Sequence, residues 1–176
     1  MALLMANTSN VKEMKNGRPQ SVQAPKALPN CAIVTLGATM EATKAELDHV
    51  HAVTAGTAKT AVGKFVIVAP EINVEQYRMI DNDIAKFMLE AEEVYTAYEL
   101  QLHDRLEFSE AYFATLPSVG QTVNIADNGK LTAAAESNGG CLKVISVREQ
   151  RMPMVVLSDG SMRPAAIKMV KVEVVK

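Results

Sequence analysis

Residues Glu93–Lys130 carry the clearest structural pattern of the chain, beginning Glu-Val-Tyr-Thr-Ala-Tyr-Glu-Leu-Gln-Leu-His-Asp-Arg-Leu-Glu-Phe and closing Val-Gly-Gln-Thr-Val-Asn-Ile-Ala-Asp-Asn-Gly-Lys. One alternate set contains Val94, Thr96, Tyr98, Leu100 and Leu102, and the other contains the polar Glu99, Gln101 and His103. This period of two predicts a half-buried strand. His103-Asp104 interrupts the period, and Leu106 and Phe108 restart it, as the returning arm of a β-hairpin would. The register is predicted to be fixed, because a slip of one residue would expose the whole apolar set.

The composition is that of a soluble globular chain with one core. The 176 residues are 48% hydrophobic and 22% charged, and this length favours a single domain. Trp is absent, aromatic residues make up 5%, and Met occurs 10 times. The core is therefore expected to consist of Val, Ile, Leu, Ala and Met, of which Met fills irregular gaps well.

No targeting or membrane segment is expected. No apolar run approaches the roughly 18–20 residues that a membrane-spanning helix needs. The opening Met-Ala-Leu-Leu-Met is followed at once by Asn-Thr-Ser-Asn and lacks the regions of a signal peptide. Cys31 and Cys141 match no metal or redox spacing, so they are predicted to be free, buried thiols in a reducing compartment rather than a disulfide.

The formal net charge of −2 is unevenly distributed along the chain. Residues 1–30 carry four basic side chains and one acidic (+3), residues 140–176 carry seven and three (+4), and the remaining middle is −9. An acidic body with basic ends suits self-association or docking on an acidic protein surface, although scattered solvated charges explain it equally well. Nucleic acid is disfavoured as a partner, since the middle lacks basic residues interleaved with aromatics.

Residues 1–30 are expected to form an extended N-terminal arm, and residues 31–176 a single β-rich domain. The first segment contains Asn16-Gly17-Arg18-Pro19, Pro25 and Pro29 and no sustained period of 2 or 3.6. Such an arm is either ordered across another subunit or remains a solvated leader.

Short apolar or alternating runs, bounded by turn residues, recur through the rest of the chain. Expected strands cover residues 31–36, 48–53, 65–69, 121–126, 130–132, 141–147, 154–157 and 166–175, the last with a bulge where its apolar face changes. Asp127-Asn128-Gly129 and Ser158-Asp159-Gly160 are the turn signals. The sequence therefore predicts a mainly β fold, a small β-barrel or sandwich with one or two short helices.

Two segments favour short helices. Within residues 73–92, apolar side chains from Tyr77 to Met88 recur at three- and four-residue steps behind Asn73 as a cap. Asp81-Asn82-Asp83 opposes a continuous helix, so two separate turns are the alternative, and this cluster lacks the Gly and Glu of an EF-hand loop. Residues 40–47 are mostly good helix formers and predict one helical turn.

The sequence predicts no catalytic, cofactor-binding or metal-binding residues, and an enzyme is not expected. It contains no nucleophile elbow and no His-Glu-x-x-His motif. His49 and His51 would share a strand face, as two metal ligands can, but without a third ligand they are interpreted as exposed histidines. Residues 56–65 superficially resemble a phosphate loop, but six residues separate the glycines and Phe65 replaces Ser or Thr. The carboxylates Glu90, Glu92 and Glu93 are interpreted as a solvated face rather than an acid–base pair.

A family resemblance is carried by Leu36-Gly37, Phe65–Glu71, Ile80–Asp83, Tyr98–Leu100, Asp104–Phe108, Val119–Val123 and Asn128–Leu131. In this order the pieces resemble small structural proteins of tailed bacteriophages, in particular head decoration (cement) proteins and related accessory virion proteins. The resemblance covers about residues 28–176 and lies in a pattern of strands and glycine turns.

This resemblance implies a β-rich body on the outside of an icosahedral capsid, with no active site to transfer. It implies a virion protein made in the host cytoplasm, a homo-oligomer (dimer or trimer), and the major capsid protein as partner. Multivalent contacts from the arm would cement neighbouring capsid subunits. Deletion of residues 1–28 is then expected to leave a folded domain that no longer adheres to its shell. A ring-forming tail or neck protein and a small nucleic-acid-binding module are the alternatives.

Overall fold

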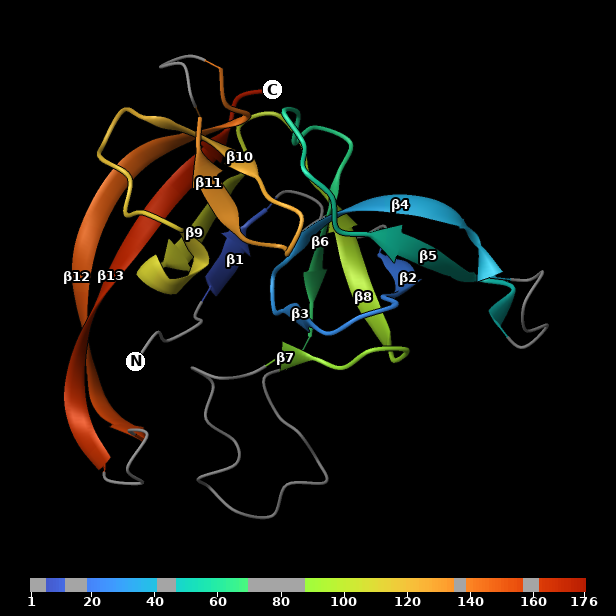
Figure 1. The fold of residues 1–176 in the computed structure, drawn as a ribbon, viewed down its shortest axis with the longest axis horizontal. Coiled ribbons are helices and arrows are strands. Elements are labelled where there is room, and N and C mark those ends of the chain that lie inside the picture. The colour runs from blue at the N-terminus through green and yellow to red at the C-terminus, as the bar shows by residue number, and fades with distance from the viewer. Residues whose placement is uncertain (1–5, 12–18, 41–46, 70–87, 135–138, 157–161) are drawn as a thin grey trace.

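A closed β-barrel lies beside a six-stranded antiparallel sheet (Figure 1). The structure is a computed structural model and describes residues 6–11, 19–40, 47–69, 88–134, 139–156 and 162–176. The barrel strands, in spatial order, are β2 Gln20–Gln23, β5 Val50–Thr54, β4 Ile33–Thr39, β6 Phe65–Val68 and β8 Val94–Glu99. The sheet strands, in spatial order, are β1 Ala6–Asn10, β9 Arg105–Ser109, β13 Met162–Val174, β12 Leu142–Val156, β10 Thr122–Ile125 and β11 Leu131–Ala133. A short pair, β3 Leu28–Pro29 with β7 Met88–Leu89, and the 3-10 turn η4 Glu110–Tyr112 complete the described elements. The predicted mainly β fold is confirmed, with the barrel as its architecture.

The barrel and the sheet share a hydrophobic core. Successive residues of a strand point to opposite faces, and the barrel wall is apolar on both. Val34 and Ile67 belong to the cluster that fills the barrel, whereas their neighbours Ile33 and Val66 belong to the cluster that also holds Phe108 of the sheet. Burial of each such side chain contributes about 1.5–3 kcal/mol, so the two-sided wall holds the barrel firmly against the sheet.

The predicted hairpin around His103-Asp104 is wrong, although both of its arms are strands. β8 pairs with β2 and β6 in the barrel, whereas β9 pairs with β1 and β13 in the sheet. The predicted apolar face is correct on β9, where Leu106 and Phe108 are buried. On β8 it is wrong, because Val94 of the predicted buried face is 46% exposed, whereas Ala97 of the opposite face is fully buried. The turn therefore carries the chain out of the barrel and into the sheet.

The described part of residues 1–30 is not a free arm. β1 pairs with β9, β2 pairs with both β5 and β8 and so closes the barrel, and β3 pairs with β7. Val11, Val22 and Leu28 are buried in the two core clusters. Strands this short, separated by Gly and Pro, carry no period that marks them as strands. Deletion of residues 1–28 would consequently open the barrel rather than leave a folded domain.

Most of the other predicted strands are confirmed. Residues 31–36, 48–53 and 65–69 correspond to β4, β5 and β6, and residues 121–126 with 130–132 form the hairpin β10–β11. Gly129 in its turn has φ of 74°, which glycine adopts without strain. The predicted helix at 73–92 falls largely on residues 70–87, outside the described residues, and its end, Met88–Leu89, is the strand β7. The helical turn predicted at 40–47 falls mostly on residues 41–46, which are also outside them.

The strands predicted at 141–147 and 154–157 are a single strand, β12. Its 15 residues pair with the 13 residues of β13, from Leu142 opposite Val174 to Val156 opposite Met162. The predicted bulge lies on β12 instead of β13, because the register shifts fall between residues 144 and 146 and between 152 and 155. β13 is buried on both faces, with Val170 and Val172 on one and Ile167 and Met169 on the other, so its apolar residues change face without a bulge.

Candidate functional site

The two histidines that suggested a metal have local partners in the barrel. His49 Nδ1 lies 3.0 Å from Asp48 Oδ1, and His51 Nδ1 lies 3.1 Å from the carbonyl oxygen of Gly37. Within the described ranges, no group of three or more His, Cys, Asp or Glu side chains is placed to hold a metal ion. Both imidazoles therefore make local polar contacts on β5 and the turn before it.

The glycine-bounded loop at residues 56–65 links the barrel strands β5 and β6 and makes backbone hydrogen bonds to the sheet strand β10 and the C-terminal residue. Ala58 and Ile125 exchange two backbone hydrogen bonds of 3.1 and 3.2 Å. The N–H groups of Ala61 and Val62 both donate to the carbonyl oxygen of Lys176, at 2.6 and 3.0 Å. The N–H groups of Gly63 and Lys64 likewise donate to carbonyl oxygens of the chain, so these five backbone donors are not directed at a phosphate.

Both cysteines are buried thiols, as predicted. The Cys141 Sγ lies 3.7 Å from the carbonyl oxygen of Val123 and 3.8 Å from that of Ala58, which are weak contacts at the junction of sheet and barrel loop. Burial raises the pKa of the Cys141 thiol. A reactive cysteine needs the opposite shift, so Cys141 acts as a small packing residue.

The predicted carboxylate cluster forms an exposed turn between β7 and β8, here called the acidic turn (residues 88–94). Glu90, Glu92 and Glu93 are all exposed, and the large apolar side chains Met88 and Val94 at its two ends are 41% and 46% exposed. The Tyr95 hydroxyl organises the turn by accepting the Glu90 N–H at 2.8 Å and donating to Glu93 Oε2 at 3.2 Å. Burial is the main cause that raises the pKa of Tyr95. The turn is thus a preformed surface of negative charge with apolar ends.

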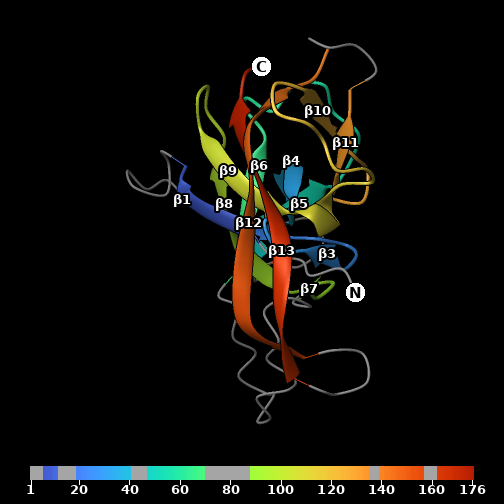
Figure 2. The same cartoon turned by 90° about the vertical axis from the view of Figure 1, so that its left-hand side faces the viewer.

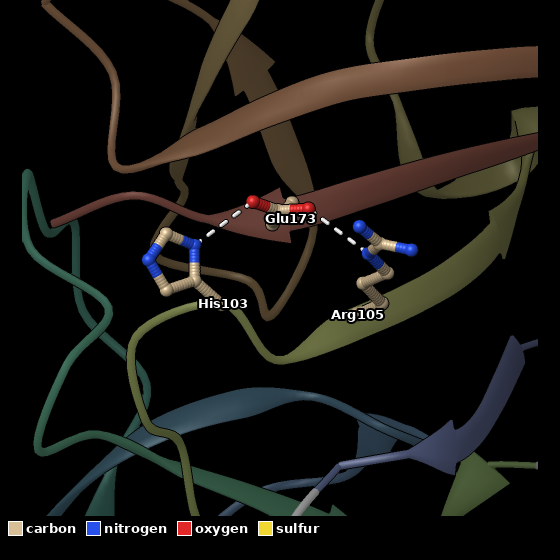
Figure 3. Close-up of polar contacts among 3 residues, drawn as sticks. All are labelled: His103, Arg105 and Glu173. Carbon is tan, nitrogen blue, oxygen red and sulfur yellow. Dashed lines mark hydrogen bonds and ion pairs between the residues drawn. The ribbon is translucent and has the colours of Figure 1, made fainter.

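A charged cluster holds the turn between barrel and sheet against the end of β13 (Figure 3). The Glu173 carboxylate accepts His103 Nδ1 at 3.0 Å on Oε1 and Arg105 Nε at 2.9 Å on Oε2. Two backbone bonds run alongside, from His103 N to Val174 O (3.0 Å) and from Val174 N to Asp104 O (2.9 Å). His103 has φ of 69°, a left-handed conformation that these contacts maintain. The cluster is therefore a clasp on the segment that joins the two halves of the fold.

The clasp predicts a pH dependence of stability. Hydrogen bonds from His103 and Arg105 hold the pKa of Glu173 below its ordinary value. A carboxyl group with a lower pKa in the folded state contributes stability that is complete above its unfolded pKa and is lost as pH falls through the folded one. Glu173→Gln is therefore expected to lower the melting temperature at neutral pH. The loss in free energy of unfolding should be at most about 1 kcal/mol, because His103 and Arg105 are half exposed.

The measurement is thermal unfolding of wild type and Glu173→Gln from neutral pH down to about pH 3, below the ordinary carboxyl range. The difference between the two proteins should shrink as pH falls. Glu99→Gln, an exposed carboxylate on β8, removes the same charge without the clasp and serves as control. A difference that stays constant with pH would show that the clasp contributes no charge-dependent stability.

A second ion pair braces the sheet where β12 begins to leave it. Arg148 on β12 donates through Nε and Nη2 to the two carboxylate oxygens of Glu107 on β9, at 2.7 and 2.9 Å, across the intervening strand β13. The Glu107 side chain is only 10% exposed, and the pairing raises the pKa of Arg148. This bidentate pairing fixes the orientation of the guanidinium group of Arg148 and the carboxylate of Glu107.

Beyond that brace, β12 and β13 form a two-stranded ribbon, here defined as residues 149–156 and 162–168. β10 pairs with β12 only at Leu142 and Lys143, and β9 pairs with β13 only from Met169 to Glu173. Among the described residues, the strands of the ribbon pair with each other and with no third strand. The ribbon continues well past the rest of the sheet in both views (Figures 1 and 2). This ribbon is therefore a candidate surface for contact with another molecule.

The sequence did not reveal the ribbon or the clasp. Met152-Pro153 interrupts the alternating pattern of β12, so the pattern predicts two short strands in place of one long strand. His103 and Glu173 are 70 residues apart, and no local pattern relates them. The available signal was the excess of basic residues after residue 140, which the ribbon now places on an exposed element.

Comparisons with known proteins provide no family assignment. No protein-family description, no curated protein and no solved structure matches this chain. In the described ranges, none of the helical segments has the length and apolar character to span a membrane. The function is accordingly argued from the fold and its surfaces.

Proposed function

We propose that this chain is a structural virion protein that binds the outside of a phage capsid and cements neighbouring capsid subunits. The observation that carries the proposal is the ribbon, which extends beyond a β body whose barrel and sheet share one core. A cement protein must reach past its own footprint, because it stabilises a lattice by binding several subunits at once. With the N-terminal segment paired into the fold, the ribbon takes the bridging role that the arm was expected to have.

The first test is the copy number of this polypeptide in purified virus particles from its source, measured by mass spectrometry relative to the major shell protein. A copy number comparable to that of the shell protein is expected for a decoration protein. A copy number that suffices for only one closed ring per particle would favour the tail or neck alternative, since such components form a single closed assembly. Absence from the particles would overturn the virion proposal.

The second test asks whether the ribbon is needed for adhesion. Replacing residues 153–164 by Asn-Gly joins the paired residues Met152 and Ala165 through a two-residue turn of the type that hairpins favour. The shortened protein retains all residues of the two core clusters and is expected to fold. It should lose most of its binding to purified shells in co-sedimentation and no longer raise the temperature at which the shells disassemble. Adhesion equal to wild type would contradict a bridging role for the ribbon.

A further inference from the structure

The ribbon and the acidic turn are complementary in charge. By sequence, residues 149–156 and 162–168 carry three basic side chains and one acidic side chain, and residues 88–94 carry three acidic side chains and no basic one. On the ribbon, Arg151 and Lys168 are exposed, as are all three glutamates of the turn. The ribbon's single acid, Glu149, lies opposite Lys168 in the register, and this leaves the net charge of the ribbon positive.

We propose that the ribbon of one copy docks on the acidic turn of a second copy. The two surfaces lie apart on one chain, with the ribbon on the sheet side and the acidic turn on the barrel side (Figure 1). One chain cannot bring its own ribbon onto its own turn, so the contact forms between copies. A contact between two different surfaces of the same protein repeats head to tail, and it closes into a ring when the rotation between copies allows.

The form of the two surfaces supports this contact. An isolated two-stranded hairpin is marginally stable in water, so a ribbon of this length benefits from a partner. Strand addition along its edges is opposed by Pro153 and Pro164, which lack the N–H that a further strand would need. The contact is therefore made by side chains, with Met88 and Val94 of the turn as apolar anchors inside a rim of charge.

A charge-swap experiment on the full-length protein tests the contact in the absence of any capsid. One variant carries Arg151→Glu and Lys168→Glu on the ribbon, and the other carries Glu90→Lys and Glu92→Lys on the turn, which leaves Glu93 to accept the Tyr95 hydroxyl. Self-association is measured by sedimentation velocity over a range of protein and salt concentrations. Wild type should form oligomers that weaken with salt, and each variant should raise the dissociation constant about tenfold or more.

An equimolar mixture of the two variants provides the decisive test. In an equimolar mixture, the intact ribbon of one variant meets the intact turn of the other, and the reversed ribbon meets the reversed turn. Association should therefore return toward the wild-type level. Lys59→Glu with Lys130→Glu makes the same change of charge as the ribbon variant, outside both surfaces, and should associate like wild type. Thermal unfolding of every variant verifies that it is folded.

Three results would overturn the proposal. The first is a monomeric wild-type protein at high micromolar concentration, and the second is association that is unchanged by both reversals or not restored by mixing. The third is a monomer that binds duplex DNA with strong salt dependence through Arg151 and Lys168, which would assign the ribbon to nucleic acid. Because no shell is present, failure here is distinguishable from failure of the virion proposal, which depends on particle copy number.

Discussion

Gly140→Ala is expected to destabilise this protein by about 3 kcal/mol or more, because the site has no room for a methyl group. A Cβ at Gly140 would lie 2.7 Å from the Thr122 Cβ and 2.7 Å from both the N and O atoms of Val123. Two of these three atoms belong to the backbone of β10 and cannot rotate away. The substitution would displace β10 from the start of β12 and strain the 3.0 Å bond from Cys141 N to Val123 O.

The measurement is the free energy of unfolding in denaturant, together with the melting temperature, which should fall by roughly 6–12 °C for a domain of this size. Gly56→Ala is the matched control, since no atom lies within 4 Å of its added Cβ. That variant should differ from wild type by less than about 0.5 kcal/mol. If both variants were equally stable, the β10–β12 contact would have to be looser than the structure describes.

Local chemistry explains which parts of the fold were predictable. The hairpin β10–β11 was found because Asn128-Gly129 supplies the turn and the strands on either side pair with each other. The strands β4, β5 and β6 were found because they are rich in Val, Ile and Leu or alternate in polarity. In each case the information lies within about ten residues of sequence, which is the reach of a periodicity argument.

Pairing between distant strands was not predictable in the same way. β8 and β9 adjoin one short turn and both carry alternation, yet one closes the barrel and the other enters the sheet. β8 pairs with β2 and β9 pairs with β1, and both of these short strands lie in residues 1–30, where the sequence shows no period. The predicted β8–β9 hairpin and the predicted N-terminal arm are therefore wrong for the same reason. The surfaces used in the proposals follow from the same tertiary choices, since the ribbon exists only where β12 and β13 continue beyond β9 and β10.

Asn30→Ala is expected to be the other strongly destabilising substitution, with a loss of about 2–5 kcal/mol. Asn30 is 6% exposed, and its side-chain amide makes two hydrogen bonds to the backbone of Ala69. Nδ2–H donates to Ala69 O at 3.2 Å, and Oδ1 accepts the Ala69 N–H at 3.1 Å. Its Oδ1 also accepts the Cys31 N–H at 3.0 Å. Alanine would leave the N–H and carbonyl groups of Ala69, which is itself buried, without these partners.

Asn30→Asp separates the donor from the acceptor contribution. The carboxyl group keeps an acceptor for the Ala69 and Cys31 N–H groups but, when ionised, faces the Ala69 carbonyl oxygen without a donor. Burial raises the pKa of such an introduced carboxyl, so this variant should be more stable at acidic pH and lose stability as pH rises through the raised pKa. The exposed Asn128, whose Oδ1 accepts the Lys130 N–H at 3.1 Å, provides the matched control.

Denaturant unfolding of Asn30→Ala, Asn30→Asp and Asn128→Ala at several pH values distinguishes the explanations. Asn128→Ala should cost less than about 1 kcal/mol, since water replaces its exposed contact. A loss for Asn30→Ala as small as that of Asn128→Ala would mean that water reaches Ala69 or that the chain rearranges to pair it. A large loss would show that the side-chain bonds to Ala69 and Cys31 stabilise the fold, since the backbone carbonyl of Asn30 still accepts the hydroxyl of the fully buried Tyr112 in the variant. Asn30 would then connect two parts of the fold, with its side chain bonded to Ala69 at the end of β6 and its backbone carbonyl bonded to Tyr112 beneath the sheet.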